Sequence, residues 1–230
     1  MKTLIIGGGE IGTSLSNALF DEYAPDVYDI KDKKGSVLCE NYEIMHICFP
    51  YSDKFVDSVK EYQNKFKPKY TVIHSTVPVG TSKKLNATHS PCVGIHPNLT
   101  VSMKTFTKFI GGPDASKVAN YFRRTGMKVY LTDKAETTEF CKIQSTTFYS
   151  LYIEFFKDMK TQCDKLNIPF ELWTLWINNY NNGYKILGCP EYTRPNLVPI
   201  MTKQGGHCTI SNLDFINTPF TKFLKEVTNV

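Results

Sequence analysis

Three glycines near the start of the chain have the spacing that brings a backbone against a phosphate. Apolar residues 3–6 lead directly into G-G-G-E-I-G at residues 7–12, after which apolar residues recur at helical spacing. In such a unit the first glycine permits a tight turn, the second lets a pyrophosphate approach, and the third lets the helix pack on the strand. The helix N-terminus then presents N–H groups and a positive dipole end. The residues expected to bind a dinucleotide are Gly7, Gly9, Glu10, Ile11 and Gly12, and the alternative is a tight strand–helix turn of structural value only.

Asp29 stands twenty residues after Gly9, at the end of a second short strand expected over residues 26–30. A carboxylate at this point accepts hydrogen bonds from the ribose hydroxyls of NAD. The alternative is an ordinary turn aspartate. Lys31, Lys33 and Lys34 follow it, and their positive charges leave NADP open as the less favoured cofactor.

Three further side chains are candidates for nucleophilic or proton-transfer chemistry. Cys208 follows two glycines and a histidine at an expected helix start, where the dipole and an imidazole favour the thiolate. Lys142, on an expected long helix, is suited to stabilise an alkoxide or to exchange a proton. His96 precedes a proline after an expected strand and is suited to accept a proton near neutral pH. Each also has a structural interpretation: a small residue in a tight turn for Cys208, a surface lysine for Lys142, and a hydrogen-bond donor for His96.

The order of these segments resembles that of the UDP-glucose/GDP-mannose dehydrogenase family. Residues 74–81, H-S-T-V-P-V-G-T, are similar to its Ser-Thr-Val-Pro-x-Gly-Thr signature. Ala135-Glu136 with Lys142 opens a long helix as the central helix of that family opens, and residues 205–208, G-G-H-C, resemble the segment that carries its catalytic thiol. The resemblance covers nearly the whole chain and implies NAD-dependent oxidation of an alcohol. The residues expected to act in catalysis are Cys208, Lys142, His96 and Thr76.

The same resemblance implies how the cofactor lies. Pro50 and Tyr51, after the third expected strand, line its adenine side. Ser75 and Thr76 lie near the nicotinamide ring, because ligands bind at the carboxyl ends of the strands in such sheets.

The chain also departs from the family pattern. Family members carry a further nucleotide-sugar-binding domain after the cysteine, whereas 22 residues follow Cys208 here. Three polar groups of the family have changed: the Pro-Glu glutamate is Asn98, the asparagine four residues beyond the lysine is Thr146, and the aspartate four beyond the thiol is Asn212. Double oxidation of a sugar nucleotide, through a thiohemiacetal and a thioester on the cysteine, is therefore not expected.

Three other functions remain open. Prephenate dehydrogenases of the same superfamily pair a serine with a Gly-x-His-Pro histidine, and here Ser75 and His96 stand 21 residues apart in that relation. The chain is alternatively a catalytically reduced dinucleotide-binding module, or a separate chain supplies the missing sugar-nucleotide domain.

Alternating strand and helix patterns over the first 130 or so residues predict an α/β fold with a Rossmann-type doubly wound parallel sheet. Expected strands cover residues 44–49, 70–74, 92–95, 108–111 and 128–131, and expected helices cover residues 52–66, 79–86 and 114–125. Residues 135–166 lack glycine and proline and predict one long central helix. A second helix follows over residues 169–182, and a last one over residues 209–227, which contains the helix breaker Pro219. We expect a dinucleotide-binding domain at residues 1–133 and a small all-helical dimerisation and substrate domain at residues 134–230.

Composition sets the remaining expectations. The net charge of +5 is mild and its lysines are scattered, which suits a small anionic substrate and gives no nucleic-acid motif. An aromatic stripe on the expected long helix predicts a homodimer through residues 135–180. The chain begins with a core strand, and no apolar stretch reaches membrane-spanning length. The seven cysteines lack metal-ligand spacing, which predicts no metal site and a reducing cytoplasm. Those expected to be buried free thiols are Cys39, Cys48, Cys92 and Cys141.

Overall fold

The structure is a computed structural model that describes residues 1–30, 41–202 and 210–228. It divides into two compact units, Met1–Ile143 (unit 1) and Gln144–Val230 (unit 2). The helix α6 (Ala135–Leu166) begins in unit 1 and continues into unit 2. The expected separation into functional domains at residues 133 and 134 stays a prediction.

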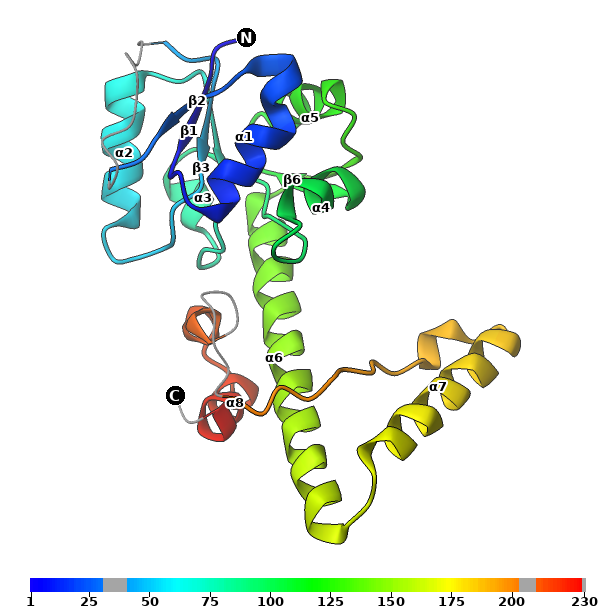
Figure 1. Cartoon of the computed structure of the whole chain (residues 1–230). Coiled ribbons are helices and arrows are strands. Elements are labelled where there is room, and N and C mark those ends of the chain that lie inside the picture. Colours follow the sequence, from blue (N-terminus) through cyan, green and yellow to red (C-terminus); the bar gives the residue numbers. More distant parts are fainter. Residues whose placement is uncertain (31–40, 203–209, 229–230) are drawn as a thin grey trace. The chain divides into compact units, whose positions relative to one another are not determined.

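Unit 1 is built on a seven-stranded sheet with the order β2-β1-β3-β4-β5-β6-β7 (Figure 1). The strands are β1 (Thr3–Ile6), β2 (Asp26–Tyr28), β3 (Ile44–Ile47), β4 (Tyr70–Ile73), β5 (Thr88–His89), β6 (Lys108–Gly111) and β7 (Val129–Thr132). All neighbours pair in parallel except β5 and β6, which are antiparallel. The chain passes from β1 to β2 on one side and returns to β3 on the other. The carboxyl ends of β1 and β3 therefore flank the crevice where such sheets bind ligands.

Helices cover both faces of this sheet (Figure 1). One face carries α1 (Glu10–Tyr23), α4 (Leu99–Thr105) and α5 (Ala115–Arg124), and the other carries α2 (Phe55–Phe66) and α3 (Thr81–Lys84). Successive residues of β1 serve the two faces: Ile5 packs in the core beneath α1 and α5, whereas Leu4 and Ile6 pack in the core beneath α2. Because helices cover both faces of the sheet, β1 is buried on both sides, and this explains its uninterrupted apolar sequence.

The strand predicted over residues 92–95 is wrong. The fifth strand is the two-residue β5, and residues 90–95 form no strand or helix. Gly94 has φ +153°, and a Cβ built on it would lie 2.3 Å from the Cβ of Ser102 on α4. The chain therefore turns at Gly94 so that α4, a helix the sequence did not predict, packs against it. Cys48 and Cys92 are buried as predicted, but Cys141 is exposed.

Unit 2 contains the rest of α6 followed by α7 (Phe170–Ile186), two 3₁₀ turns, η1 (Pro190–Tyr192) and η2 (Ser211–Phe215), and α8 (Pro219–Thr228). The long helix has the predicted bounds. The last predicted helix is divided, because Pro219 begins α8 at a position where its missing N–H costs no hydrogen bond. Within the described residues no helix has both the length and the apolar character needed to cross a membrane.

Candidate functional site

The glycine turn lies directly after β1, at the carboxyl edge of the sheet. Gly7 has φ +100°, and its N–H donates to the Tyr28 carbonyl at 2.8 Å. A Cβ on Gly12 would lie 1.8 Å from the carbonyl oxygen of Gly7, so only glycine lets α1 begin this close to the strand. A Cβ on Gly9, by contrast, would meet no described atom within 4 Å. The three glycines therefore have different tasks, and only Gly9 faces open space through which a ligand can approach.

Asp29 lies beside this turn. Its Oδ2 accepts a hydrogen bond of 2.6 Å from the backbone N–H of Gly8, and a Cβ on Gly8 would lie 3.2 Å from the Cβ of Asp29. The carboxylate at the end of β2 is thus attached to the turn at the end of β1. The sequence predicted both positions, and the structure brings them together. Lys31, Lys33 and Lys34 lie outside the described residues.

Glu10, the first residue of α1, contacts His96 through a carboxylate–imidazole hydrogen bond between Oε1 and Nδ1. Both side chains are about half exposed. The two residues are 86 positions apart in the chain. This contact holds the predicted proton acceptor at the rim of the glycine turn.

The segment after β4 carries Ser75 and Thr76. The Ser75 hydroxyl is buried and donates to the Phe49 carbonyl at 2.6 Å, which ties the end of β4 to the end of β3 beside Pro50. The segment ends in α3, where the carboxylate of Glu139 accepts two backbone N–H groups, from Gly80 at 2.6 Å and from Ser82 at 2.8 Å.

His89 joins the same segment to α6. Its Nε2 is 3.2 Å from the Ser75 carbonyl oxygen and its Nδ1 is 2.7 Å from the Thr138 hydroxyl. Burial, with help from the charges of Lys108 and Lys142, lowers the pKa of His89 to about 3. Ser75, predicted from the sequence, is therefore linked to Thr138 of α6 through a histidine that the sequence analysis missed.

A second buried chain of polar groups runs under α5. Thr3 and Tyr121 lie 3.3 Å apart at their hydroxyls, Tyr121 is 3.2 Å from His46 Nε2, and His46 Nδ1 is 2.9 Å from His74 Nε2. His74 Nδ1 lies 2.7 Å from the Ser90 carbonyl. Because that carbonyl only accepts, one direction satisfies the whole chain with neutral rings: Thr3 donates to Tyr121, which donates to His46, His74 and finally Ser90. A histidine inside the apolar run of β3 was the available signal.

Lys108 on β6 is buried beside this chain. Its Nζ is 3.5 Å from His74 Nδ1 and 4.8 Å from the centre of the Phe122 ring. No carboxylate among the described residues pairs with it, and burial lowers the pKa of Lys108. Burial and the charge of Lys108 in turn lower the pKa of His46 to about 3. The arrangement belongs to the core of unit 1.

In unit 2, the two positions where the chain departs from the resembled family contact each other. The Asn212 carboxamide donates to the Thr146 hydroxyl at 3.2 Å, and both residues are buried. Neither group exchanges a proton near neutral pH. Cys208, with Gly205–His207, lies outside the described residues, as does Cys39.

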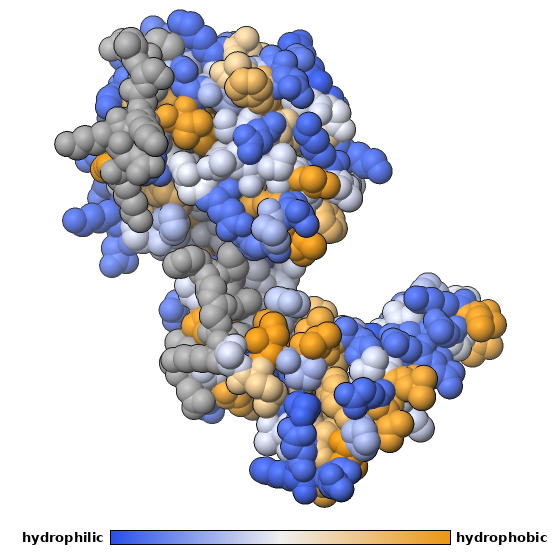
Figure 2. Space-filling view, viewed as in Figure 1, coloured by the Kyte–Doolittle hydropathy of each residue, from blue (hydrophilic) through white to orange (hydrophobic). Residues whose placement is uncertain are grey.

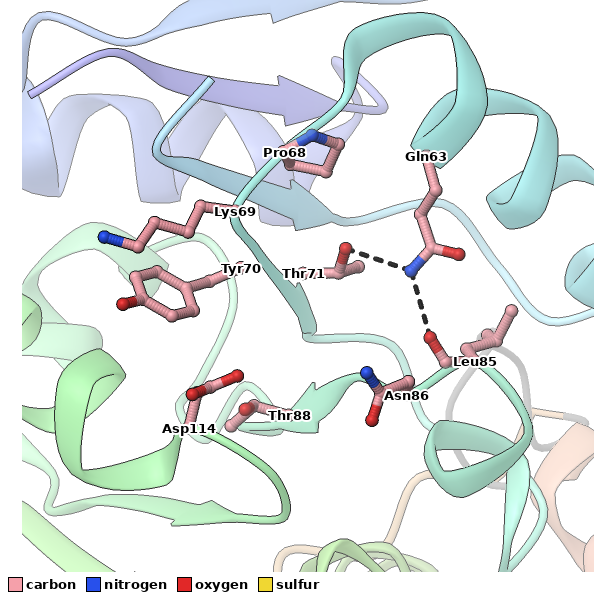
Figure 3. A pocket seen from close by; sticks show the side chains of 9 residues that line it. All are labelled: Gln63, Pro68, Lys69, Tyr70, Thr71, Leu85, Asn86, Thr88 and Asp114. Carbon is pink, nitrogen blue, oxygen red and sulfur yellow. Dashed lines mark hydrogen bonds between the residues drawn. The ribbon is translucent and has the colours of Figure 1, made fainter. Parts of the chain in front are cut away.

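A cavity of about 290 Å³ lies at the opposite, amino edge of β4 and β5 (Figure 3). Its wall is fixed by Gln63, whose Nε2 donates to the Thr71 hydroxyl at 3.1 Å and to the Leu85 carbonyl at 3.0 Å. The candidate cofactor residues lie at the carboxyl edge, so this cavity is separate from them. The described residues hold no cluster of three or more His, Cys, Asp or Glu side chains suited to a metal ion.

The structure has the fold of known dehydrogenases. It superposes on the UDP-D-ManNAc dehydrogenase from Pyrococcus horikoshii with a TM-score of 0.73 and 14% identity, covering 100% of this chain and 68% of that one. The UDP-N-acetyl-mannosamine dehydrogenase from Staphylococcus aureus gives 0.72 and 16% over the same shares. Psf3 in complex with NADP⁺ and 2-OPP gives 0.62 and 11%, over 99% and 93% of the two chains. No protein-family model and no curated protein sequence matches the chain.

Proposed function

We propose that the chain binds NAD at the Gly7–Gly12 turn and is an oxidoreductase that oxidises the alcohol carbon of a small anionic substrate. One observation carries the proposal: Asp29 is hydrogen-bonded to the glycine turn at the switch point of the sheet, with open space at Gly9. This is the arrangement that a pyrophosphate and an adjoining ribose require.

The protein residues supply orientation and proton handling, because bound NAD supplies the hydride acceptor. Ser75 and Thr76 line the nicotinamide side, and Pro50 the adenine side. Glu10 holds His96 at the turn, where the imidazole is available to take the substrate hydroxyl proton. Lys142 stabilises the alkoxide oxygen. A Cys208 thiolate would add to the carbonyl product, and the adduct would then be oxidised by hydride transfer to a second NAD.

The second candidate is a module that binds the dinucleotide but no longer turns over a substrate. The buried Thr146–Asn212 pair favours it, because a hydroxyl and a carboxamide stand where the resembled family has groups that assist catalysis. Both candidates keep the cofactor site.

Two measurements test these proposals. Thermal unfolding with NAD and NADP tests the cofactor site, and a ligand at a hundredfold excess over its Kd stabilises the folded state by about 2.7 kcal/mol. No shift with either dinucleotide contradicts both candidates. Alkylation of Cys208 across pH then tests the covalent step: a thiolate formed well below the usual thiol range supports covalent oxidation, and ordinary thiol reactivity excludes it.

We also propose a homodimer formed through the helices of unit 2. Figure 2 shows apolar side chains exposed along these helices. Of the described residues of α7, only Ile177 has a buried side chain. Trp176 is 68% exposed and Ile186 is 86% exposed. An apolar surface of this extent favours a protein partner, and a second copy of the same helices is the partner we propose.

A further inference from the structure

The Ser75–Ser82 segment is attached to the start of α6 at both of its ends. At one end the Ser75 carbonyl reaches Thr138 through His89, and at the other Gly80 and Ser82 donate to Glu139. Thr138, Glu139 and His89 are fully or almost fully buried. Adjacent residues of α6 therefore hold the two ends of one loop.

The hydrogen positions follow from the chemistry of the ring. Because burial lowers the pKa of His89 to about 3, its imidazole is neutral and carries one proton near neutral pH. The Ser75 carbonyl only accepts, so this proton lies on Nε2. Nδ1 is then an acceptor, and the Thr138 hydroxyl donates to it at 2.7 Å rather than to the Ala135 carbonyl at 2.9 Å. The connection has a single direction, from Thr138 through His89 to Ser75.

We propose that Thr138, His89 and Glu139 are positioning residues that hold the Ser75–Ser82 segment in place before the nicotinamide half of a dinucleotide binds to it. The inference rests on the proposed NAD site and adds the residues that prepare it. A loop that is already fixed loses little conformational freedom when a ligand binds, whereas a released loop must be ordered by the ligand at a cost in affinity.

A comparison of two probes isolates this effect. ADP-ribose contains the adenosine, pyrophosphate and ribose of NAD but lacks the nicotinamide. Titration calorimetry on the full chain measures the Kd of each. Thr138→Val removes the hydroxyl and keeps the shape of the side chain, so we expect NAD to bind roughly 5- to 10-fold more weakly, the loss that one hydrogen bond represents. ADP-ribose is expected to bind within about twofold of its original Kd, and Thr138→Ser is expected to restore NAD binding.

One control variant and one further test variant accompany this experiment. Thr137→Val makes the same substitution at the neighbouring exposed position of α6 and is expected to change neither Kd. Glu139→Gln, which sets an amide NH₂ against one of the two backbone N–H groups, should show the same selective loss as Thr138→Val.

The outcomes are distinguishable. Unchanged NAD binding in Thr138→Val, or an equal loss for both probes, overturns the positioning role while the cofactor site stands. Failure of the unmodified chain to bind either probe overturns the cofactor site, and the positioning role with it.

Discussion

Asp29 is the residue on which the proposed preference for NAD depends. Its carboxylate accepts the Gly8 N–H and lies where the adenosine ribose of a dinucleotide is expected. A negative charge at this point repels the 2′-phosphate of NADP. The residue therefore has a local structural task and a proposed task in recognition, and an isosteric substitution separates them.

We predict that Asp29→Asn raises the Kd for NAD about tenfold, which corresponds to about 1.4 kcal/mol of binding free energy. The difference in affinity between NAD and NADP is expected to become smaller. The asparagine side-chain oxygen still accepts the Gly8 N–H, so the turn is expected to keep its shape. Binding of both dinucleotides is measured by calorimetry. The control is Asp21→Asn on the exposed side of α1, and equal affinities in the two variants would contradict the assignment.

Helix α1 and its approach to β1 illustrate how the glycines act at the scale of elements. Ala is usually the better helix former, by about 1 kcal/mol over Gly. At Gly12 this preference is outweighed, because the added Cβ would lie 1.8 Å from a backbone oxygen that cannot move without shifting the strand or the helix. At Gly9 the backbone has φ −67° and the surrounding space is open, so an added methyl group meets only an incoming ligand.

The two glycines are therefore expected to respond in opposite ways. Gly12→Ala should lower the free energy of unfolding by 3 kcal/mol or more, a loss of about the size that overpacked sites show at their most severe. Gly9→Ala should keep the free energy of unfolding within about 0.5 kcal/mol of that of the unmodified chain. The same variant should weaken NAD binding at least tenfold. Urea unfolding and calorimetry on the same preparations measure both quantities. If Gly9→Ala binds NAD normally, the pyrophosphate does not lie on this turn.

At the scale of the whole molecule, the buried histidines make unit 1 sensitive to acid. His46 and His89 have pKa values near 3 in the folded chain, against 6.5 when unfolded. Between these values the unfolded state binds more protons, so the stabilising contribution is complete above pH 6.5 and is lost as pH falls toward 3. The main cause is burial, since a charged imidazole would lose its hydration, and in both histidines it would also repel Lys108.

We predict that the free energy of unfolding falls by about 1.4 kcal/mol per pH unit for each of these histidines below pH 6. Urea unfolding at intervals from pH 7.5 to 4.5 measures the slope. His46→Gln removes one titrating group. The slope of the unfolding free energy against pH is therefore expected to fall by the contribution of one proton, about 1.4 kcal/mol per pH unit. An unchanged slope would show that His46 is protonated in the folded state at these pH values.

The proposed dimer is also a property of the whole molecule. Trp176→Glu introduces a charge into the exposed apolar surface of α7 and is expected to convert the dimer into a monomer at micromolar concentration. Lys185→Glu on the same helix is the control and should leave the dimer intact. Light scattering coupled to size exclusion gives the mass directly, and a monomeric unmodified chain would contradict the proposal.

The sequence by itself determined the elements whose signals are local. A glycine turn after an apolar strand, and a long segment free of glycine and proline, specify backbone conformation within a few residues. They therefore predicted β1, α1 and the bounds of α6. The strand predicted over residues 92–95 was wrong, because their apolar pattern resembles that of a strand. The packing of α4 against Gly94 decides the path of the chain there.

The tertiary structure alone decided which side chains meet. His89, Thr138 and Glu139 carry no motif, and their connection to Ser75, Gly80 and Ser82 exists because β5 and the start of α6 come together in the fold. The same holds for the link between Glu10 and His96. Backbone preference is encoded over a few neighbouring residues, whereas a polar contact between distant positions depends on how the whole sheet and its helices pack.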